Sequence, residues 1–424
     1  MKVDVLLGLQ WGDEGKGKIV DVLTPHYDIV ARFQGGPNAG HTLKFDGKKV
    51  ILHTIPSGIF RENTVNVIGN GVIIDPMIML NKEIKQISEI TEVKSKLYIS
   101  EKTHLILPTH RLLDAANEAF RGEKKIGSTL KGIGPTYTDK VSRNGLRIGD
   151  LLLPDFQKKY NYLKKLHFQQ IEAMKFDYNS VQIDGFSFSQ YESAWLEAAQ
   201  ELTSYRICAT EYLLNNALTD GKKILAEGAQ GTLLDIEFGS YPYVTSSNTI
   251  TAGVCSGLGI APAKIGTVYG LFKSYCTRVG EGPFPTELLD DTGKLLQVQG
   301  NEFGSTTGRP RRCGWLDLPL LKYACMLNGV TELIMMKADV LNTLENINIC
   351  TSYKYNGNLT SEIPYDPFAK LEPQYQQLKG WNRQIDINEM PSELGDYIAF
   401  IEQYLELKIK LVSVGADREQ NIVI

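Results

Sequence analysis

The sequence lacks the features of a membrane, secreted or general nucleic-acid-binding protein. No apolar run approaches the ~20 residues that cross a bilayer, and no signal-peptide pattern precedes the strand-like residues that begin at Val3. The 49 acidic residues nearly balance the 45 basic ones, so the net charge of −4 gives no general attraction to nucleic acid or membrane. We therefore expect a cytoplasmic protein whose partners include neither.

Cysteine pairs of the C-x-x-C kind and low-complexity linkers are missing as well. The 6 cysteines are scattered, which favours packed thiols in a reducing compartment over disulfides or a zinc site. Strand-like apolar runs continue along the 424 residues without a repeat or a Pro/Ser/Gly-rich linker. Length alone suggests roughly two or three domains, and the pattern equally allows one large α/β domain with insertions.

What the chain does have is a phosphate-loop pattern at its start. Residues 3–7 (VDVLL) predict a buried strand, residues 12–17 a glycine-rich turn, and residues 19–23 the start of a helix. In such a turn, glycines let backbone N–H groups converge on an anion, and the helix N-terminus adds partial positive charge. Lys18 is placed to reach the outer phosphates as a point charge.

The pattern departs from the usual phosphate loop at one informative position. Ile19 stands where Ser or Thr normally holds magnesium, so another residue must supply an oxygen ligand. Asp13, within the loop, is the obvious donor for a hard cation, because a carboxylate beside phosphates needs a metal or a proton-transfer role. The alternative is a glycine-rich turn with solvated charges.

A second polar loop follows the next predicted strand, residues 28–33. Residues 34–42 (QGGPNAGHT) predict a tight surface loop that offers Asn38 and His41 as its chemical groups. Residues 45–48 then indicate a hairpin. Because ligands of open α/β sheets collect at the carboxyl ends of strands, we expect this loop to lie beside the first one.

Residues 11–18 (WGDEGKGK) followed by residues 34–42 resemble the adenylosuccinate synthetase family, and the resemblance recurs along nearly the whole chain. It implies a single domain over residues 1–424 with helical and loop insertions, built on a large, mostly parallel central sheet flanked by helices. It also implies GTP-dependent ligation of IMP and L-aspartate to adenylosuccinate through 6-phosphoryl-IMP, with release of GDP and phosphate. This reaction is the first committed step of AMP synthesis from IMP.

By the same resemblance, the first two loops form the catalytic centre. Asp13 would be the base for N1–H of IMP and a ligand of one Mg²⁺ per subunit, together with the backbone carbonyl of Gly40. His41 would be the general acid. The GTP contacts implied here are Gly12, Asp13, Glu14, Gly15, Lys16, Gly17, Lys18, Gly40, His41 and Thr42. The implied IMP contacts are Asp13, Asn38, Ala39, Gly40 and His41.

Residues 124–147 are rich in Lys and Arg and, read alone, form either an anion-binding loop or a solvated basic face. The resemblance implies that Thr129 contacts the IMP phosphate, and that Arg143 contacts it across a homodimer interface. Leu130-Lys131 stands where many relatives have Gly-Arg, which bears on the conformation of the loop.

Residues 156–218 predict mostly helix, and we assign them no chemistry. A strand at 224–226 leads into a glycine turn with Gln230, and Thr245 follows. Polar residues in such turns often serve only as capping residues. The resemblance instead implies that Gln230 contacts IMP and that Thr245 contacts its phosphate.

Residues 304–312 (GSTTGRPRR) form a loop that is rich in arginine. Guanidinium groups bind carboxylates bidentately, so the loop suits a dicarboxylate such as aspartate, unless it is simply an exposed basic loop. The resemblance places Arg309 also near IMP and Arg311 near GTP. Pro310 interrupts the usual arginine run and should stiffen the loop. The implied aspartate contacts are Ser305, Thr306, Thr307, Gly308, Arg309, Pro310 and Arg311.

A buried strand at 333–336 ends in Lys337-Ala338-Asp339. The carboxylate of Asp339 can accept from N1–H and the 2-amino group of guanine, and adenine offers neither donor. A final strand at 410–412 leads to the turn that, by resemblance, frames the base, where Ala416 replaces a common proline. The remaining implied GTP contacts are Arg311, Lys337, Ala338, Asp339, Ser413, Val414 and Gly415.

Two other classes of protein share part of this pattern. A guanine-nucleotide switch has the phosphate loop and an Asp339-like base contact, but it has no use for the arginine loop or His41. Such a switch hydrolyses GTP without IMP or aspartate. An ATP-dependent ligase would use ATP as well as GTP.

Overall fold

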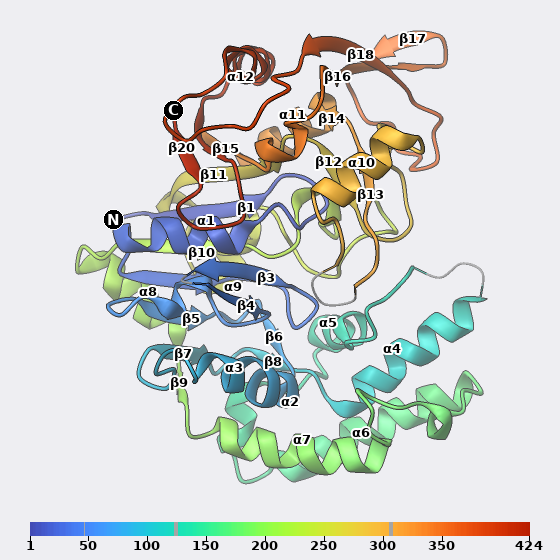
Figure 1. Ribbon diagram of the computed structural model, residues 1–424. Coiled ribbons are helices and arrows are strands. Elements are labelled where there is room, and N and C mark those ends of the chain that lie inside the picture. Colours follow the sequence, from blue (N-terminus) through green and yellow to red (C-terminus); the bar gives the residue numbers. More distant parts are fainter. Residues whose placement is uncertain (46, 123–125, 305–307) are drawn as a thin grey trace.

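The structure is a computed structural model that describes residues 1–424 apart from 46, 123–125 and 305–307. Its centre is a ten-stranded sheet in the order β20-β19-β15-β11-β1-β10-β2-β5-β7-β9 (Figure 1). Neighbouring strands pair in parallel, except that β20 runs antiparallel to β19. This confirms the predicted fold class. The strands are β1 (Val3–Gly8), β2 (Ile29–Arg32), β5 (Val65–Ile68), β7 (Leu97–Ser100), β9 (Arg206–Cys208), β10 (Ile224–Glu227), β11 (Ile265–Lys273), β15 (Glu332–Met336), β19 (Ile409–Ser413) and β20 (Asn421–Val423).

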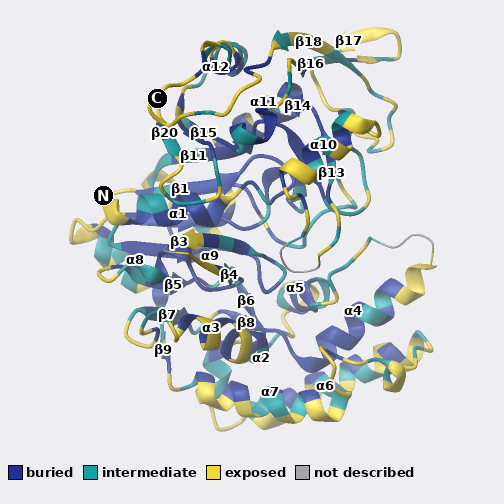
Figure 2. Ribbon diagram, in the orientation of Figure 1, coloured by how far each residue is buried: buried dark blue, intermediate teal, exposed yellow. Residues whose placement is uncertain are grey.

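Both faces of the central strands are buried, which is why these strands read as continuous apolar runs rather than alternating ones. On one face, Leu6 of β1 shares a core with Ile19 and Val20 of helix α1 (Lys16–Leu23). On the other face, Val5 and Leu7 belong to the largest core, which also includes residues of helices α8 (Thr210–Thr219), α9 (Ala252–Leu258) and α11 (Leu318–Asn328). Figure 2 shows the sheet as the most deeply buried layer of the molecule.

Two groups of elements extend beyond the sheet on opposite sides (Figure 1). Helices α4 to α7 form one group. The other combines helices α11 and α12 with a small sheet in which β16 pairs with β14, β17 and β18. The helices are α2 (Pro76–Ile78), α3 (Lys85–Ile87), α4 (Pro108–Arg121), α5 (Ile133–Ser142), α6 (Phe156–Ala173), α7 (Phe188–Leu202), α8 (Thr210–Thr219), α9 (Ala252–Leu258), α10 (Asp291–Gln299), α11 (Leu318–Asn328) and α12 (Ser392–Leu405). The remaining strands are β3 (His41–Phe45), β4 (Lys48–Leu52), β6 (Ile73–Ile74), β8 (His104–Leu105), β12 (Cys276–Arg278), β13 (Arg312–Gly314), β14 (Leu316–Asp317), β16 (Asn346–Tyr355), β17 (Asn358–Thr360) and β18 (Glu372–Lys379).

The predicted hairpin is confirmed by the antiparallel pair β3 and β4, although residue 46 within its turn lies outside the described residues. The predicted helical stretch is confirmed by α6, α7 and α8. The strand at 410–412, β19, was expected to be the last one, and this expectation is wrong because β20 follows it. β20 is only three residues long and lies at the sheet edge, so it gives little periodic signal. Within the described residues, no helix is long and apolar enough to span a membrane.

Candidate active site

Five of the predicted site segments lie at one edge of the central sheet, which includes six neighbouring parallel strands. β19, β15, β11, β1, β10 and β2 lie side by side and run in the same direction, so their carboxyl ends share one edge. The glycine turn, the second polar loop, the Gln230 turn, the Asp339 segment and the turn after β19 each follow one of these strands. This is where ligands collect in open α/β sheets.

The first loop is supported from inside by its own carboxylate. Oε1 of Glu14, which is fully buried, accepts from the backbone N–H of Gly12 at 2.9 Å and of Gln10 at 3.2 Å. Its other oxygen pairs with the ammonium of Lys16 at 2.5 Å. Gly15 begins α1 in the left-handed conformation (φ 91°). The side chains of Glu14 and Lys16 therefore pair with each other, and the carboxylate of Glu14 holds two N–H groups at the start of the loop in place.

Lys18 contacts another segment of the predicted GTP site. Its ammonium donates to Oγ of Ser413 at 2.7 Å and to the carbonyls of Gly415 and Gln420 at 2.9 and 3.0 Å. Burial lowers its pKa to about 8, partly offset by the charge of Asp339. The ammonium group of Lys18 thus joins the first loop to the turn after β19, and its contact with the phosphates stays a prediction.

His41 is held in one orientation by a buried carboxylate. Its Nδ1 lies 2.6 Å from Oε1 of Glu227, and that carboxylate also accepts from the backbone N–H and the hydroxyl of Ser57. A carboxylate only accepts, so Nδ1 carries the proton and the neutral ring presents Nε2 as an acceptor. Burial, followed by the charge of Arg32, lowers the pKa of His41 to about 4. The buried Nε2 has no hydrogen-bond partner among the described residues.

Two glycines let other elements approach the first loop closely. A β-carbon at Gly17 would lie 3.0 Å from Cβ of His41, and one at Gly15 would lie 2.9 Å from Cε of Met336, at the end of β15. A side chain at Gly17 would press on Cβ of His41, whereas one at Gly15 would displace the flexible end of Met336. The first loop is therefore packed directly against the second loop and against the strand that leads to Asp339.

Several buried polar atoms at this edge have no hydrogen-bond partner within the described part of the chain. They are Oδ1 of Asn38, Oε1 and Nε2 of Gln230, and Oδ1 of Asp339. Gln230 has φ 55°, and its backbone lies 3.5 Å from the position of a β-carbon at Gly12. An unpaired buried polar atom costs about 1–3 kcal/mol, so a group of them at one sheet edge indicates a polar ligand.

The arginine loop is joined to the first loop by an ion pair. Nε of Arg311 lies 2.8 Å from Oδ2 of Asp13, and another nitrogen of Arg311 pairs with the buried carboxylate of Glu302. Arg309 donates to the carbonyl of Gly127 at 3.3 Å, so the arginine loop also contacts the basic segment. Three predicted aspartate contacts lie outside the described residues: Ser305, Thr306 and Thr307.

The basic segment presents its predicted residues at the surface. Thr129 is half-buried, and Leu130 beside it adopts the left-handed conformation (φ 54°), with its carbonyl accepting from Nε of Arg111 at 2.7 Å. Arg143 ends α5, also in the left-handed region (φ 66°), and is exposed. Among the described residues, no hydrogen bond or ion pair is found for its guanidinium.

Thr245, the other residue predicted to contact the phosphate of IMP, is half-buried.

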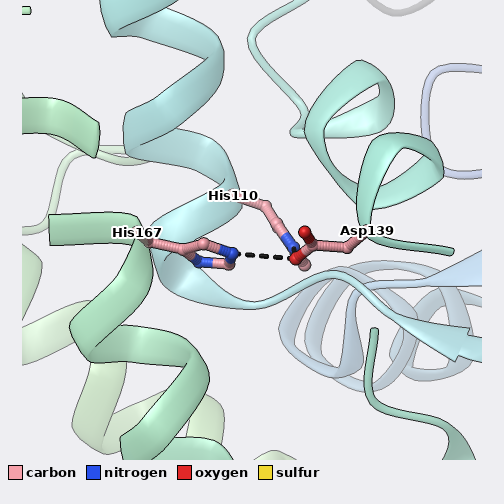
Figure 3. Close-up of side chains that lie close together, drawn as sticks. All are labelled: His110, Asp139 and His167. Atoms are coloured by element: carbon pink, nitrogen blue, oxygen red, sulfur yellow. Dashed lines mark hydrogen bonds and ion pairs between the residues drawn. The ribbon is translucent and has the colours of Figure 1, made fainter. Parts of the chain in front are cut away.

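A second cluster of titratable groups lies among α4, α5 and α6 (Figure 3). Nε2 of His110 and Nε2 of His167 lie 2.9 and 2.8 Å from the same oxygen of Asp139. Nδ1 of His110 accepts the backbone N–H of Leu107, so the proton of the ring is on Nε2. A metal would need a lone pair at that nitrogen. The three side chains therefore form a hydrogen-bonded clamp between helices rather than a metal centre.

Two buried carboxylates that organise the site were not predicted from the sequence. Glu227 is the last residue of β10, and Glu302 follows α10; both are 0% exposed. A weak signal existed for Glu227, because an acidic residue at the end of an apolar strand needs a partner. Glu302 lies in no recognisable motif, and its partners come from distant parts of the chain.

The site is a phosphate loop at the carboxyl edge of a mostly parallel sheet, with an aspartate in the loop and a histidine beside it. This arrangement is typical of a nucleotide-dependent α/β enzyme. The family described as adenylosuccinate synthetase matches residues 5–422, and the chain belongs to this family. It is thus a GTP-dependent ligase that joins IMP and L-aspartate in AMP biosynthesis.

The similarity to individual relatives extends over the full length. The adenylosuccinate synthetase of Flavobacterium psychrophilum is 57% identical over 428 residues, which cover 100% of both chains. That of Cytophaga hutchinsonii is 57% identical over 430 residues, covering 100% of this chain and 98% of the other. The solved structure of fully ligated adenylosuccinate synthetase from Plasmodium falciparum superposes with a TM-score of 0.90 at 38% identity, and each chain is covered completely.

Proposed function

We propose that the ligation proceeds in two steps at the shared edge of the sheet. In the first step, O6 of IMP attacks the γ-phosphorus of GTP, GDP leaves, and a base removes the N1 proton, which gives 6-phosphoryl-IMP. In the second step, the amine of L-aspartate attacks C6, phosphate leaves and the amine loses a proton. The observation that carries the proposal is the set of buried, unpartnered polar atoms of Asn38, His41, Gln230 and Asp339 on loops from one sheet edge.

Asp13 is the base for N1–H in this proposal and the protein's carboxylate ligand for Mg²⁺. It lies in the first loop with φ 60° and forms an ion pair with Arg311. The backbone carbonyl of Gly40 is the second ligand. A carboxylate and a carbonyl are the donors that Mg²⁺ prefers, so the residues fit this ion. When bound, Mg²⁺ would neutralise charge on the phosphoryl oxygens.

His41 is the general acid toward the phosphoryl group. Because Nε2 of the neutral ring is an acceptor, the ring must gain a proton before it can donate from that nitrogen. The negative charge of the GTP phosphates favours the imidazolium form, and Glu227 on the opposite nitrogen stabilises it. We therefore assign the protonation of His41 to the binding of GTP.

The remaining predicted residues bind the three substrates. Asp339 reads guanine through its unpartnered oxygen, with Lys337, Ala338 and the turn of residues 413–415 around the base. Residues 305–311 hold the carboxylates of L-aspartate. The IMP contacts are Asp13, Asn38, Ala39, Gly40, His41, Thr129, Gln230, Thr245 and Arg309, and Arg143 from a second copy of the chain.

The assembly in this proposal is a homodimer in the cytoplasm. The exposed guanidinium of Arg143, at the end of α5, supports a contact outside its own subunit. The described cysteines are free thiols, as in a reducing compartment. We treat residues 1–424 as one domain, since the central sheet takes strands from both ends of the chain.

A matrix assay tests the proposed function directly. GTP or ATP is supplied with and without IMP and L-aspartate, and adenylosuccinate and inorganic phosphate are both measured. Adenylosuccinate should form only when GTP, IMP and L-aspartate are present together. Release of phosphate from GTP alone would favour a guanine-nucleotide switch, and equal use of ATP would contradict the assignment of Asp339 to guanine.

A further inference from the structure

Glu302 is the centre of a buried cluster of charges behind the arginine loop. Among the described residues, it forms ion pairs with Lys273 at 3.0 Å, Lys337 at 2.7 Å and Arg311. The hydroxyl of Tyr275 donates to the same carboxylate. Glu302 and Lys273 are both 0% exposed. A buried charge of this kind is stable only while its partners remain, so the cluster holds its members in a fixed arrangement.

Each cation of the cluster comes from a different functional segment. Lys273 ends β11, Lys337 directly follows β15 beside the guanine-reading Asp339, and Arg311 ends the arginine loop. Arg311 extends the cluster to the first loop, because its Nε lies 2.8 Å from Asp13. The carboxylate of Glu302 is thus in contact with a residue of the aspartate site and a residue of the GTP site.

The backbone of Glu302 also fixes the base of the arginine loop. Its carbonyl accepts the N–H of Arg311 at 2.9 Å, and Phe303 and Pro310 form an isolated antiparallel bridge one residue further on. The side chain of Gln297, on α10, donates to the carbonyl of Arg311 at 2.7 Å. The two ends of the segment that carries the proposed aspartate contacts therefore meet at Glu302 and Arg311.

We propose that Glu302 is a positioning residue that orients Arg311 for L-aspartate and keeps its second nitrogen from also pairing with Asp13. This inference rests on the proposed function. Lys337 has a second acceptor in the carbonyl of Gly300 at 2.7 Å. Lys273 likewise has the hydroxyl of Thr277 at 2.7 Å.

The charge of Arg311, in contrast, is shared between two carboxylates, those of Asp13 and Glu302. Without the negative charge of Glu302, two nitrogens of the Arg311 guanidinium group would pair with the carboxylate of Asp13, because arginine often binds a single carboxylate bidentately. That movement would take the guanidinium group of Arg311 away from L-aspartate. It would also block Asp13, the proposed acceptor of the N1 proton. Loss of Glu302 should therefore act on the aspartate step more strongly than on IMP or GTP binding.

The experiment compares Glu302→Gln and Glu302→Asp with the wild type. Glu302→Gln should raise the KM for L-aspartate roughly tenfold to a hundredfold, the value of a charge-assisted contact, and the KM for IMP by less than about threefold. Glu302→Asp keeps the charge and should recover part of the loss. If Glu302→Gln does not fold, Tyr275→Phe is the second variant, because it removes one hydrogen bond from the same carboxylate. It should also raise the KM for L-aspartate.

Asp75→Asn is the matched control, because Asp75 is also a buried carboxylate held by an arginine and a tyrosine hydroxyl, Arg111 and Tyr191. It should lower thermal stability without a selective rise in the aspartate KM.

A second readout omits L-aspartate. Oxygen-isotope scrambling within GTP, measured in the presence of IMP alone, reports the phosphoryl-transfer step. Scrambling should persist in Glu302→Gln. If wild-type protein shows neither scrambling nor adenylosuccinate formation, the proposed function fails. If the wild type shows both and folded Glu302→Gln keeps the wild-type aspartate KM, the role of Glu302 is overturned. A rise in the IMP and GTP KM values as large as that for L-aspartate would also overturn it, because it would indicate a general structural role.

Discussion

The imidazole of His41 and the carboxylate of Glu227 form a buried pair in which Nδ1 lies 2.6 Å from Oε1. This contact leaves Nε2 as the only nitrogen of His41 that can meet a ligand. Because the pKa of the ring is lowered to about 4, chiefly by burial, the free protein presents a neutral acceptor there. The proposed role of general acid needs the protonated ring, so His41 must take up a proton from solution when the substrate binds.

The first prediction is that GTP binding takes up a proton at His41. The bound phosphates should raise the pKa of His41 well above about 4, so binding takes up a proton at any pH between the free and bound values. GTP affinity should consequently weaken as the pH rises through that window. Calorimetric titrations in buffers of different ionisation enthalpy measure the uptake.

The variant His41→Asn is the control for this measurement, since GTP itself also titrates near neutral pH. Its proton uptake should be smaller than that of the wild type. Glu227→Gln removes the charge that stabilises the imidazolium and should reduce the uptake as well. Equal uptake in wild type and His41→Asn would show that His41 does not change its protonation state.

The second prediction is that Asp13→Asn abolishes most turnover while the fold remains. The substitution removes the proton acceptor and one charge at the proposed metal site, and general-base catalysis is worth ~10²–10⁴-fold. Turnover at saturating substrates and the thermal midpoint should be measured together. A loss of less than about tenfold, with the wild-type midpoint, would remove Asp13 from the role of base.

The third prediction concerns base selection. Oδ1 of Asp339 is buried and has no partner within the described residues, so it is available to the base. Asp339→Asn should relax the preference for GTP and admit XTP, because an amide can donate to the 2-oxo group where the carboxylate only accepted. The ratio of kcat/KM values for GTP and XTP measures the change. An unaltered ratio would mean that another group reads the purine.

The sequence was sufficient for the central architecture but not for the buried charges. Apolar runs such as that of β1 predict buried strands, and the parallel arrangement then brings their loops to one edge. The partners of Lys18 could not be predicted, because Ser413 is 395 positions away along the chain. Glu227 and Glu302 were missed for the same reason. The role of a buried carboxylate depends on the cations and hydrogen-bond donors around it, and these come from distant parts of the chain.

The fourth prediction concerns the stability of the basic segment. Leu130 is 45% exposed and has φ 54°, a conformation that costs a non-glycine residue roughly 1–2 kcal/mol. Leu130→Gly should raise the free energy of unfolding by about 0.5–1 kcal/mol, after allowance for the greater chain entropy of glycine. Denaturant unfolding measures this difference.

Leu153 provides the matched control, since it is 48% exposed but has φ −98°. Leu153→Gly should lower stability, because no strain is relieved there. Destabilisation of similar size in both variants would contradict the assignment of strain to Leu130.

The fifth prediction concerns the assembly. Arg143 ends α5 with its side chain exposed, and α5 is clamped to α4 and α6 by Asp139 with His110 and His167. These contacts fix the position of α5, and with it the position of Arg143 at its end. If Arg143 completes the site of a two-fold partner, Arg143→Leu and Asp13→Ala should each be inactive alone and should complement each other when mixed.

The expected recovery follows from the symmetry. With random exchange of equal amounts, about half of the dimers are mixed, and each mixed dimer has one site with both wild-type residues. Activity should therefore approach about a quarter of the wild-type value. A mixture of Asp13→Ala with Asp13→Asn should stay inactive, which controls for activation by exchange itself. IMP should also tighten the dimer in sedimentation experiments, because a ligand that contacts both subunits binds only the assembled form. If subunit exchange is demonstrated by mass spectrometry and no activity returns, Arg143 serves its own subunit.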